Sequence, residues 1–276
     1  MSPVLAGTGV AAYAGAWADP GQVWWRAALA LVVALALQVA VNYANDYSDG
    51  IRGTDDDRVG PLRLTGSGLA RPGAVKRAAF LAFGVAGAAG LVLAATTAWW
   101  LLGVGVLCVL AGWFYTGGTR PYGYAGLGEV MVFVFFGLVA VVGTTYVQTR
   151  TFEPAAWAAA IGIGALACAI LVANNLRDIP TDTEAGKLTL AVRLGDRRTR
   201  VWYVALVVVA VLAALAVAVL TTWWAAVGVL FVAVVVPGVR AVVGGATGRG
   251  LIPALQVTGK AELAWAVLVA LPLFVA

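Results

Sequence analysis

The sequence predicts an all-α, polytopic membrane protein with about nine transmembrane helices, on two observations. First, 62% of the 276 residues are hydrophobic and only 11% are charged, so the mean hydropathy of +0.93 lies far above that of ordinary soluble domains. Second, the apolar stretches alternate with short polar ones and continue to the last residue, so a cleaved signal peptide does not account for them.

A spanning helix needs about 20 mostly apolar residues, and this length divides the chain into nine candidate spans. They lie near residues 2–17, 22–44, 74–97, 98–115, 125–147, 154–175, 200–220, 222–243 and 260–276. We therefore treat residues 1–276 as a single membrane domain. Long acidic connections follow the second and the sixth span. This recurrence predicts two related four-helix units, roughly 1–115 and 125–243, followed by the final helix at 260–276.

Basic residues and tryptophans fall on opposite sides of these spans. Sixteen of the eighteen Lys and Arg residues lie in or beside the connections that follow the second, fourth, sixth and eighth spans. Only Arg26 and Arg150 lie on the other side of the membrane. Eight of the eleven tryptophans lie on that opposite side, as an aromatic belt does. The positive-inside rule then predicts a plasma-membrane protein with its N-terminus and its acidic connections in the cytoplasm. The net charge of +5 thus reflects topology, and nucleic acid is not an expected partner.

Cysteine and histidine give no support for a disulfide scaffold, a zinc site or haem ligation. Cys108 and Cys168 lie inside apolar runs without paired spacing, and the sequence contains no histidine. Both cysteines are therefore interpreted as small buried hydrophobic residues. Any bound metal would need oxygen ligands, which favours Mg²⁺, Ca²⁺ or Mn²⁺.

Two polar segments, residues 45–58 and 174–187, hold eight of the thirteen acidic residues. If a helix ends within the first segment, Asn45 and Asp49 share one of its faces, because residues four apart are neighbours on a helix. The same holds for Asp178 and Asp182 if the second helix continues through Pro180. Each segment then offers a pair of oxygen ligands.

Facing carboxylates repel one another near a membrane unless cations neutralise them. Mg²⁺ prefers one or two carboxylates, with water and a substrate phosphate in its remaining positions. The pattern therefore predicts a Mg²⁺-dependent clamp for a diphosphate, with basic candidates Arg58, Lys76, Arg177 and Lys187. Each segment alone is compatible with a solvated connector, but their matched side, spacing and position favour a common function.

Two weaker features lie between the acidic segments. The Gly-rich stretch from Tyr115 to Tyr124 is interpreted either as a tight helical hairpin or as a turn whose tyrosines line the mouth of the site. Glu129 is a polar residue in or at the end of the fifth span. Such a residue faces a cavity or stabilises a helix N-terminus, and the sequence leaves both open.

At these residues the chain resembles the UbiA superfamily of intramembrane prenyltransferases, over nearly its whole length. Asn45 and Asp49 match the superfamily's first motif, Asn-x-x-x-Asp-x-x-x-Asp, whereas Gly53 stands at its third position. In the branch that acts on 1,4-dihydroxy-2-naphthoate, this motif instead looks like Asn-Asp-Tyr-x-Asp-Gly-x-x-Gly-x-Asp. This chain reproduces that pattern from Asn45 to Asp55. Residues 57–63, the Tyr-Thr-Gly-Gly turn and the stretches that follow it, and residues 174–178 also look like that branch.

The resemblance implies a helical bundle around a central cavity, with Mg²⁺ as cofactor and membrane lipid around it. It implies transfer of a polyprenyl group from polyprenyl diphosphate to 1,4-dihydroxy-2-naphthoate, with loss of diphosphate and CO₂, to give demethylmenaquinol in menaquinone biosynthesis. The implied metal ligands are Asn45, Asp46, Asp49, Asp178 and Asp182. The implied catalytic residues are Asp49, Asp178, Asp182 and Lys187, and the implied substrate-binding residues are Asn45, Arg58, Lys76, Tyr115, Tyr124, Asn174 and Arg177.

Two alternatives remain beside this interpretation. One is another UbiA-type enzyme with a 4-hydroxybenzoate or lipid-ether acceptor, against which Gly53 and the Asn-Asn-x-Arg-Asp run argue. The other is a transporter of divalent cations or phosphorylated lipids. A transporter predicts ionisable residues in the middle of the membrane, whereas here they gather at the ends of the spans.

Overall fold

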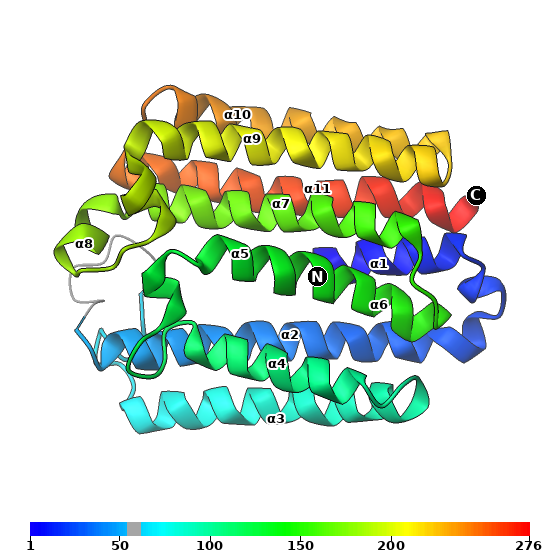
Figure 1. The fold of residues 1–276 in the computed structure, drawn as a ribbon, viewed down its shortest axis with the longest axis horizontal. Helices are drawn as coiled ribbons and strands as arrows, with labels where there is room; N and C mark the ends of the chain where they lie inside the picture. Colours follow the sequence, from blue (N-terminus) through cyan, green and yellow to red (C-terminus); the bar gives the residue numbers. More distant parts are fainter. Residues whose placement is uncertain (54–61) are drawn as a thin grey trace. The chain divides into compact units, whose positions relative to one another are not determined.

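The structure is a computed structural model that describes residues 1–53 and 62–276, apart from the side chains of Pro20 and Gln22. All regular structure in these residues is helical (Figure 1), which confirms the all-α prediction. The α-helical segments are α1 (Ser2–Tyr13), α2 (Pro20–Gly50), α3 (Pro72–Thr96), α4 (Leu101–Phe114), α5 (Gly128–Val132), α6 (Ala140–Thr149), α7 (Pro154–Arg177), α8 (Ile179–Glu184), α9 (Leu190–Leu220), α10 (Phe231–Val243) and α11 (Ile252–Val275). Four 3₁₀ turns, η1 (Ala16–Ala18), η2 (Tyr122–Ala125), η4 (Trp223–Leu230) and η5 (Gly248–Leu251), and one π-helical segment, η3 (Phe133–Val139), complete the order.

Seven of the described helices are long and apolar enough to cross a membrane, so the chain is a multi-pass membrane protein. They are Val23–Gly50, Pro72–Thr96, Gly128–Thr149, Pro154–Arg177, Leu190–Leu220, Trp223–Val243 and Gly248–Val275. The other two predicted spans correspond to α1 and α4, which have 12 and 14 residues. Both are shorter than the roughly 20 residues of a full span.

The helices form two compact units. The first contains residues 1–28, 129–177 and 194–276, and the second contains residues 29–128 and 178–193. This division by contacts is a different property from an internal repeat, so the predicted pair of four-helix units stays a prediction.

Small residues bring the helices of the first unit into close contact. A methyl group added at Gly9 of α1 would lie 2.7 Å from the backbone of Ala270 in α11, and one at Gly162 of α7 would lie 2.4 Å from the Trp265 ring. Such close approach of small residues is a usual basis of helix packing in membranes. α11 therefore contacts both α1 and α7 within this unit (Figure 1).

The second unit is centred on α2, α3 and α4, which lie side by side in Figure 1. Ala40 and Ala44 of α2 pack against Ala79 and Phe83 of α3, and Trp113 of α4 covers this cluster. Because α2 continues to Gly50, the residues of the first acidic motif from Asn45 to Gly50 form its last turns.

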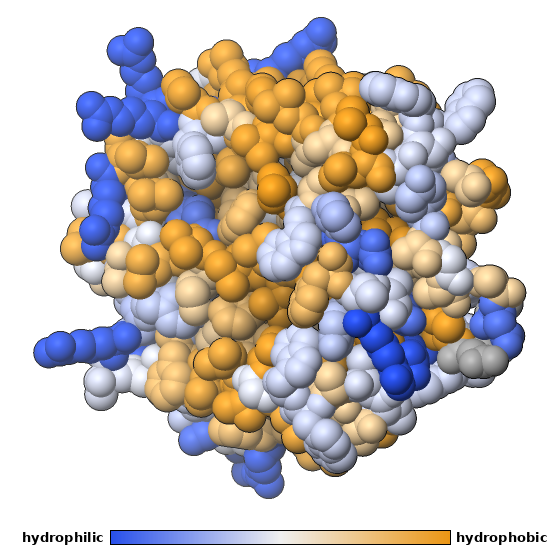
Figure 2. Space-filling model, turned by 45° about the vertical axis from the view of Figure 1, so that its right-hand side comes forward, coloured by the Kyte–Doolittle hydropathy of each residue, from blue (hydrophilic) through white to orange (hydrophobic). Residues whose placement is uncertain are grey.

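The outer surface suits lipid. Figure 2 shows hydrophobic side chains over much of the face in view, with strongly hydrophilic ones projecting mainly from its margins. Leu35, Leu81 and Leu212 are among the large apolar side chains that remain exposed on the spanning helices. Their exposure costs little when the surrounding medium is hydrocarbon.

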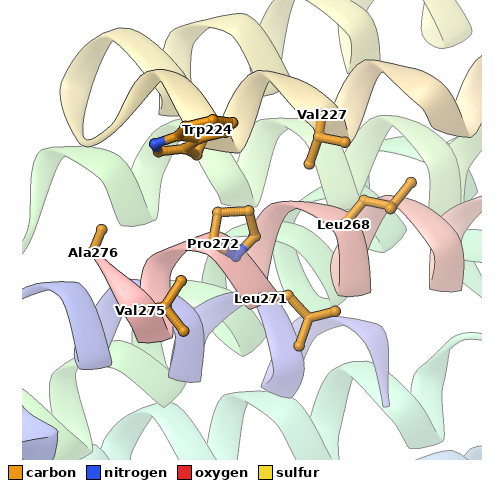
Figure 3. A pocket seen from close by; sticks show the side chains of 7 residues that line it. All are labelled: Trp224, Val227, Leu268, Leu271, Pro272, Val275 and Ala276. Carbon is orange, nitrogen blue, oxygen red and sulfur yellow. The ribbon is translucent and has the colours of Figure 1, made fainter.

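An apolar pocket of about 510 Å³ lies in the first unit, between η4 and the C-terminal end of α11 (Figure 3). Trp224 and Val227 face it from η4, and Leu268, Leu271 and Pro272 from α11, with the last two residues of the chain beside them. No charged side chain lines it. A diphosphate therefore has no counter-charge there, and the candidate site lies among the acidic residues instead.

Candidate active site at the acidic motifs

The first acidic motif is held on the last turns of α2. The helix continues through residue 50, so Asn45 and Asp49 lie on one face, as the spacing predicts. Asp46 and Asp49 are both 5% exposed. Buried carboxylates are costly unless hydrogen bonds or cations compensate them, so the partners of these two groups decide what each one does.

Asp46 holds the loop that follows α2. Its two carboxylate oxygens accept hydrogen bonds from the backbone N–H groups of Leu64 and Thr65, at 2.9 and 2.8 Å. Thr65 also lies against Gly50, where an added methyl group would meet its side chain at 2.5 Å. Both of its oxygens thus bond backbone amides, so Asp46 closes the loop after α2. Its role as a metal ligand stays a prediction, because each carboxylate oxygen keeps a further lone pair.

The turn between α4 and α5 contacts the same face of α2. The hydroxyl of Tyr124 donates a hydrogen bond to Asp49 Oδ1 at 2.7 Å, and the hydroxyl of Thr116 donates one to Asn45 Oδ1 at 2.8 Å. The Arg52 guanidinium donates to the backbone carbonyls of Thr116 and Gly118. The Gly-rich turn thus both forms a tight connection and places Tyr124 at the acidic motif.

The second motif begins where α7 ends. α7 stops at Arg177, Asp178 takes a non-helical conformation with φ −96° and ψ 6°, and α8 starts anew with Pro180 in its first turn. The condition under which Asp178 and Asp182 would share a face of one helix is therefore not met, because proline cannot donate the backbone hydrogen bond that continuation needs. The Asp182 amide still bonds the Asp178 carbonyl at 2.8 Å, so the four-residue spacing survives in the new turn.

Asn174 and Arg177, at the end of α7, form a pair with each other. Arg177 Nη2 donates a hydrogen bond to Asn174 Oδ1 at 2.9 Å, and the Arg177 side chain is buried. The pairing fixes the guanidinium at the helix end that leads directly into Asp178. A buried guanidinium with this restraint is a suitable donor to a phosphate oxygen.

The charges of the two motifs influence each other within the second unit. Burial raises the pKa of the Asp182 carboxyl to about 6; the Lys187 ammonium opposes this rise, and the negative charges of Asp178 and Asp49 add to it. Thr189 donates a hydrogen bond that lowers the same pKa. Asp49, Asp178 and Asp182 therefore belong to one electrostatic site, drawn from segments about 130 residues apart.

Lys187 and Arg52 both lie near the ring of Tyr124. The Lys187 ammonium is 4.7 Å from the centroid of the Tyr124 ring, and the Arg52 guanidinium carbon is 5.7 Å from it. Cations at these distances are attracted to the ring face. Both are thus held beside the tyrosine that binds Asp49.

The oxygen ligands of the acidic motifs suit a Mg²⁺ ion that also binds a substrate phosphate. They suit a metal ion held by protein ligands alone less well. Among the residues that the structure describes, no three acidic or cysteine side chains converge as a ligand set for a metal ion. Mg²⁺ is usually held by one or two carboxylates, with water and phosphate oxygens in its other positions. Burial first, and then the negative charges of Asp178 and Asp49, make ionisation of Asp182 costly, and a bound cation would relieve this cost.

Two predicted site residues, Lys76 and Tyr115, contact aromatic rings. A third, Arg58, lies outside the described residues. The Lys76 ammonium lies over aromatic rings, 5.4 Å from the Tyr47 centroid and 5.8 Å from that of Trp113. The Tyr115 ring packs edge-on against Tyr122 at 5.5 Å between centroids.

Sequence reasoning missed Arg52, Thr116 and Thr189 as members of the site. Arg52 was visible as a basic residue inside the first motif, three positions after Asp49, yet it counted only toward membrane topology. Thr116 and Thr189 carried no signal, because a threonine in a turn is common and its partner is distant in sequence.

Residues 1–248 match the sequence model of the UbiA prenyltransferase family. The chain belongs to the UbiA prenyltransferase family. This confirms the resemblance seen in the motifs, and a UbiA prenyltransferase is an enzyme whose acidic motifs are expected to do chemistry.

Curated relatives and solved structures agree with this membership. The 1,4-dihydroxy-2-naphthoate octaprenyltransferase of Mycobacterium tuberculosis (strain ATCC 25618 / H37Rv) is 54% identical over 270 residues, which cover 98% of this chain and 90% of that protein. The Escherichia coli (strain K12) protein of the same name is 42% identical over 197 residues, 66% of this chain and 64% of that protein.

Two archaeal UbiA homologues of known structure share the fold. The homologue from Aeropyrum pernix K1 superposes with a TM-score of 0.72 at 14% identity, covering 97% of this chain and 96% of its own. The homologue from Archaeoglobus fulgidus, solved with DMAPP and Mg²⁺ bound, gives 0.61 at 15% identity, covering 100% and 96%. At these identities the likeness concerns the fold, which confirms a UbiA-type helical bundle.

Proposed function

We infer that this chain transfers a polyprenyl group from polyprenyl diphosphate to 1,4-dihydroxy-2-naphthoate. Diphosphate and CO₂ leave, and the product is demethylmenaquinol, in menaquinone biosynthesis. The observation that carries the chemistry is the electrostatic coupling of Asp49, Asp178 and Asp182, which unites the two acidic motifs. The acceptor follows from the naphthoate-type relatives and from the motif that begins at Asn45.

The acidic residues bind and orient the diphosphate end of the donor. We assign Asn45, Asp49, Asp178 and Asp182 as the residues that would hold Mg²⁺. When bound, Mg²⁺ would neutralise the negative charge that develops on the departing diphosphate. Tyr124 orients Asp49, and Thr116 orients Asn45, so that these ligands are positioned before the substrate arrives.

Basic side chains complete the diphosphate site. Lys187 and Arg177 are assigned to the diphosphate oxygens, Arg177 in the orientation that Asn174 fixes. As the allylic C–O bond breaks, its electron pair stays with the diphosphate, and these cations stabilise that charge. The acceptor ring then forms a C–C bond with the prenyl carbon. Exclusion of water protects the allylic cation from hydrolysis.

The orientation in the membrane belongs to the same proposal. The bias of basic residues supports an orientation with the acidic motifs at the cytoplasmic face of the plasma membrane and the N-terminus inside. In this orientation a charged diphosphate reaches the site from the cytoplasmic aqueous side, while its polyprenyl chain stays in lipid.

Purified protein in detergent tests this proposal. It is offered polyprenyl diphosphate with either 1,4-dihydroxy-2-naphthoate or 4-hydroxybenzoate, in Mg²⁺ or in EDTA. We expect CO₂ release and prenylated product from the naphthoate alone, only with Mg²⁺, and lost in Asp49→Asn and Asp178→Asn. Asp196→Asn is the matched control, because it removes the same charge from a surface pair with Arg200. Product from the benzoate alone would transfer the assignment to another acceptor, and folded protein that makes neither product contradicts it.

A further inference from the structure

Glu129 is a buried carboxyl group that the diphosphate site does not use. It lies in the first turn of α5 and is 6% exposed. Its Oε1 accepts a hydrogen bond from Asn175 Nδ2 at 3.0 Å, and Asn175 is 8% exposed. Its Oε2 is buried and has no hydrogen-bond partner among the residues that the structure describes. One oxygen is thus fixed by the protein, and the other is left without a donor.

A buried acceptor without a partner is rare, because it loses its hydrogen bonds to water and regains none. A glutamine would keep the bond to Asn175 at lower cost, since an amide carries no charge to bury. The helix also changes to a π-helical form just after this residue, over Phe133–Val139. π-helical segments are rare and are frequent at functional sites. These observations indicate that a ligand with a hydrogen-bond donor completes the Glu129 site.

The covalent chain limits the distance between this carboxyl group and the residues of the prenyl-transfer site. Glu129 follows Tyr124 by five residues, and Asn175 precedes Asp178 by three. An extended chain covers at most about 3.6 Å per residue. The Cα atoms of Glu129 and Tyr124 are therefore at most roughly 18 Å apart, and those of Asn175 and Asp178 at most roughly 11 Å. The end of α7 provides a hydrogen-bond partner both to Arg177 and to Glu129. Asn174 pairs with Arg177, and the next residue, Asn175, pairs with Glu129.

The chemistry of the two substrates decides which one Glu129 receives. A carboxylate repels a diphosphate, which has no proton to donate near neutral pH. The dihydroxynaphthoate ring carries two hydroxyl donors. We propose, on the basis of the proposed function, that Glu129 Oε2 accepts the proton of the acceptor hydroxyl that neighbours the carboxyl-bearing carbon, with Asn175 positioning Glu129.

The proton balance of the step is simple. As the carboxyl-bearing carbon forms its bond to the prenyl carbon, the neighbouring hydroxyl becomes a ketone and its proton passes to Glu129. The electron pair of the broken allylic C–O bond leaves with the diphosphate. When the C–CO₂⁻ bond breaks, its electron pair restores the aromatic ring, CO₂ leaves, and the oxygen takes the proton back from Glu129. The carboxylate is regenerated, and no other reactant is needed.

Glu129→Gln tests the proposal, because it keeps an oxygen for Asn175 and replaces Oε2 by a group that donates. General-base catalysis typically contributes about 10²- to 10⁴-fold, so we expect kcat to fall by roughly 100-fold or more. The KM for polyprenyl diphosphate should stay within about twofold. Glu153→Gln, at the start of α7 near Thr151, is the matched control and should leave kcat unchanged. Thermal unfolding in detergent establishes that each variant folds.

Acceptor analogues give a readout that a merely structural role would not change. The 1-methoxy analogue cannot donate to Glu129, whereas the 4-methoxy analogue keeps the relevant hydroxyl. A hydrogen bond to a charged group corresponds to roughly a 10- to 100-fold difference in binding. We expect wild-type protein to bind the 1-methoxy analogue that much more weakly than the parent, and Glu129→Gln to bind both alike.

Each outcome has a distinct meaning. Wild-type protein that binds the 1-methoxy analogue as tightly as the parent overturns the proposal, whatever the folding of the variant. Glu129→Gln with wild-type kcat, or a slow variant that still discriminates between the analogues, overturns it as well. If wild-type protein makes no naphthoate product at all, the proposed function itself fails, and the inference about Glu129 fails with it.

Discussion

Replacing Tyr124 by phenylalanine should weaken Mg²⁺-dependent transfer without disturbing the fold. The change removes the hydroxyl that donates to Asp49 Oδ1 at 2.7 Å, while it keeps the ring that faces Lys187 and Arg52. Asp49 is 5% exposed, so water does not easily replace the lost donor. The carboxylate then loses the restraint that sets its direction toward the metal.

The size of this effect follows from the type of bond. A hydrogen bond to a charged group contributes about 1.5–3 kcal/mol, and about 1.4 kcal/mol corresponds to a tenfold change in rate. We therefore expect Tyr124→Phe to lower kcat/KM, and to raise the Mg²⁺ concentration for half-maximal rate, by roughly 10- to 150-fold. Losses of the outer partner of a metal ligand are commonly about 10- to 100-fold.

The assay is the rate of prenyl transfer against Mg²⁺ concentration, at saturating substrates. Tyr122→Phe is the matched control, because its hydroxyl donates to the Ala111 backbone carbonyl at 2.6 Å and not to a carboxylate. It should lower thermal stability and leave the Mg²⁺ dependence unchanged. A Tyr124→Phe protein whose Mg²⁺ dependence stays within twofold of wild type, or matches that of Tyr122→Phe, refutes the orienting role.

Three further outcomes are expected. Asp46→Asn should lower the free energy of unfolding by about 1–3 kcal/mol, because at least one of its two amide partners loses an acceptor; a loss of Mg²⁺ affinity as large as in Asp49→Asn would return Asp46 to the metal. In EDTA, the stability of the wild type relative to Asp182→Asn should fall as the pH rises from about 4 to above 6. The raised pKa of Asp182 means that ionisation is less favourable in the folded state, so a pH-independent difference contradicts it. Gly53→Ala should cost about 1–2 kcal/mol in thermal unfolding, because Gly53 has φ +72°, and an unchanged stability contradicts the strain.

The positions of the spans could be predicted from the sequence because lipid imposes a local rule. Each segment of about 20 apolar residues is favourable in hydrocarbon independently of its neighbours. The common face of Asn45 and Asp49 was predictable for the same reason, since it depends only on helical spacing. Gly53 is explained as well: its positive φ favours glycine where the superfamily motif has aspartate.

The partners of the motif residues could not be predicted, because they come from distant parts of the chain. Asp46 looked equivalent to Asp49, and only the return of residues 64 and 65 shows that its carboxylate also closes a loop. The break between α7 and α8 could not be decided from the sequence. The four-residue spacing favours a continuous helix, whereas Pro180 lacks the amide hydrogen that a continuous helix needs. Glu129 carried two interpretations, and the buried contact with Asn175 gives it a site beyond the helix end.

Four hydrogen bonds join residues 45–52, at and just after the end of α2, to the turn before α5, and they bear on how these enzymes can be engineered. Asn45 binds Thr116, Asp49 binds Tyr124, and Arg52 binds two carbonyls of the turn. A chimera that imports only the first acidic motif from another family member would therefore exchange one half of a matched pair. Donor motif and turn should be transplanted together, as a single cassette, when acceptor choice or metal dependence is to be moved between members of the family.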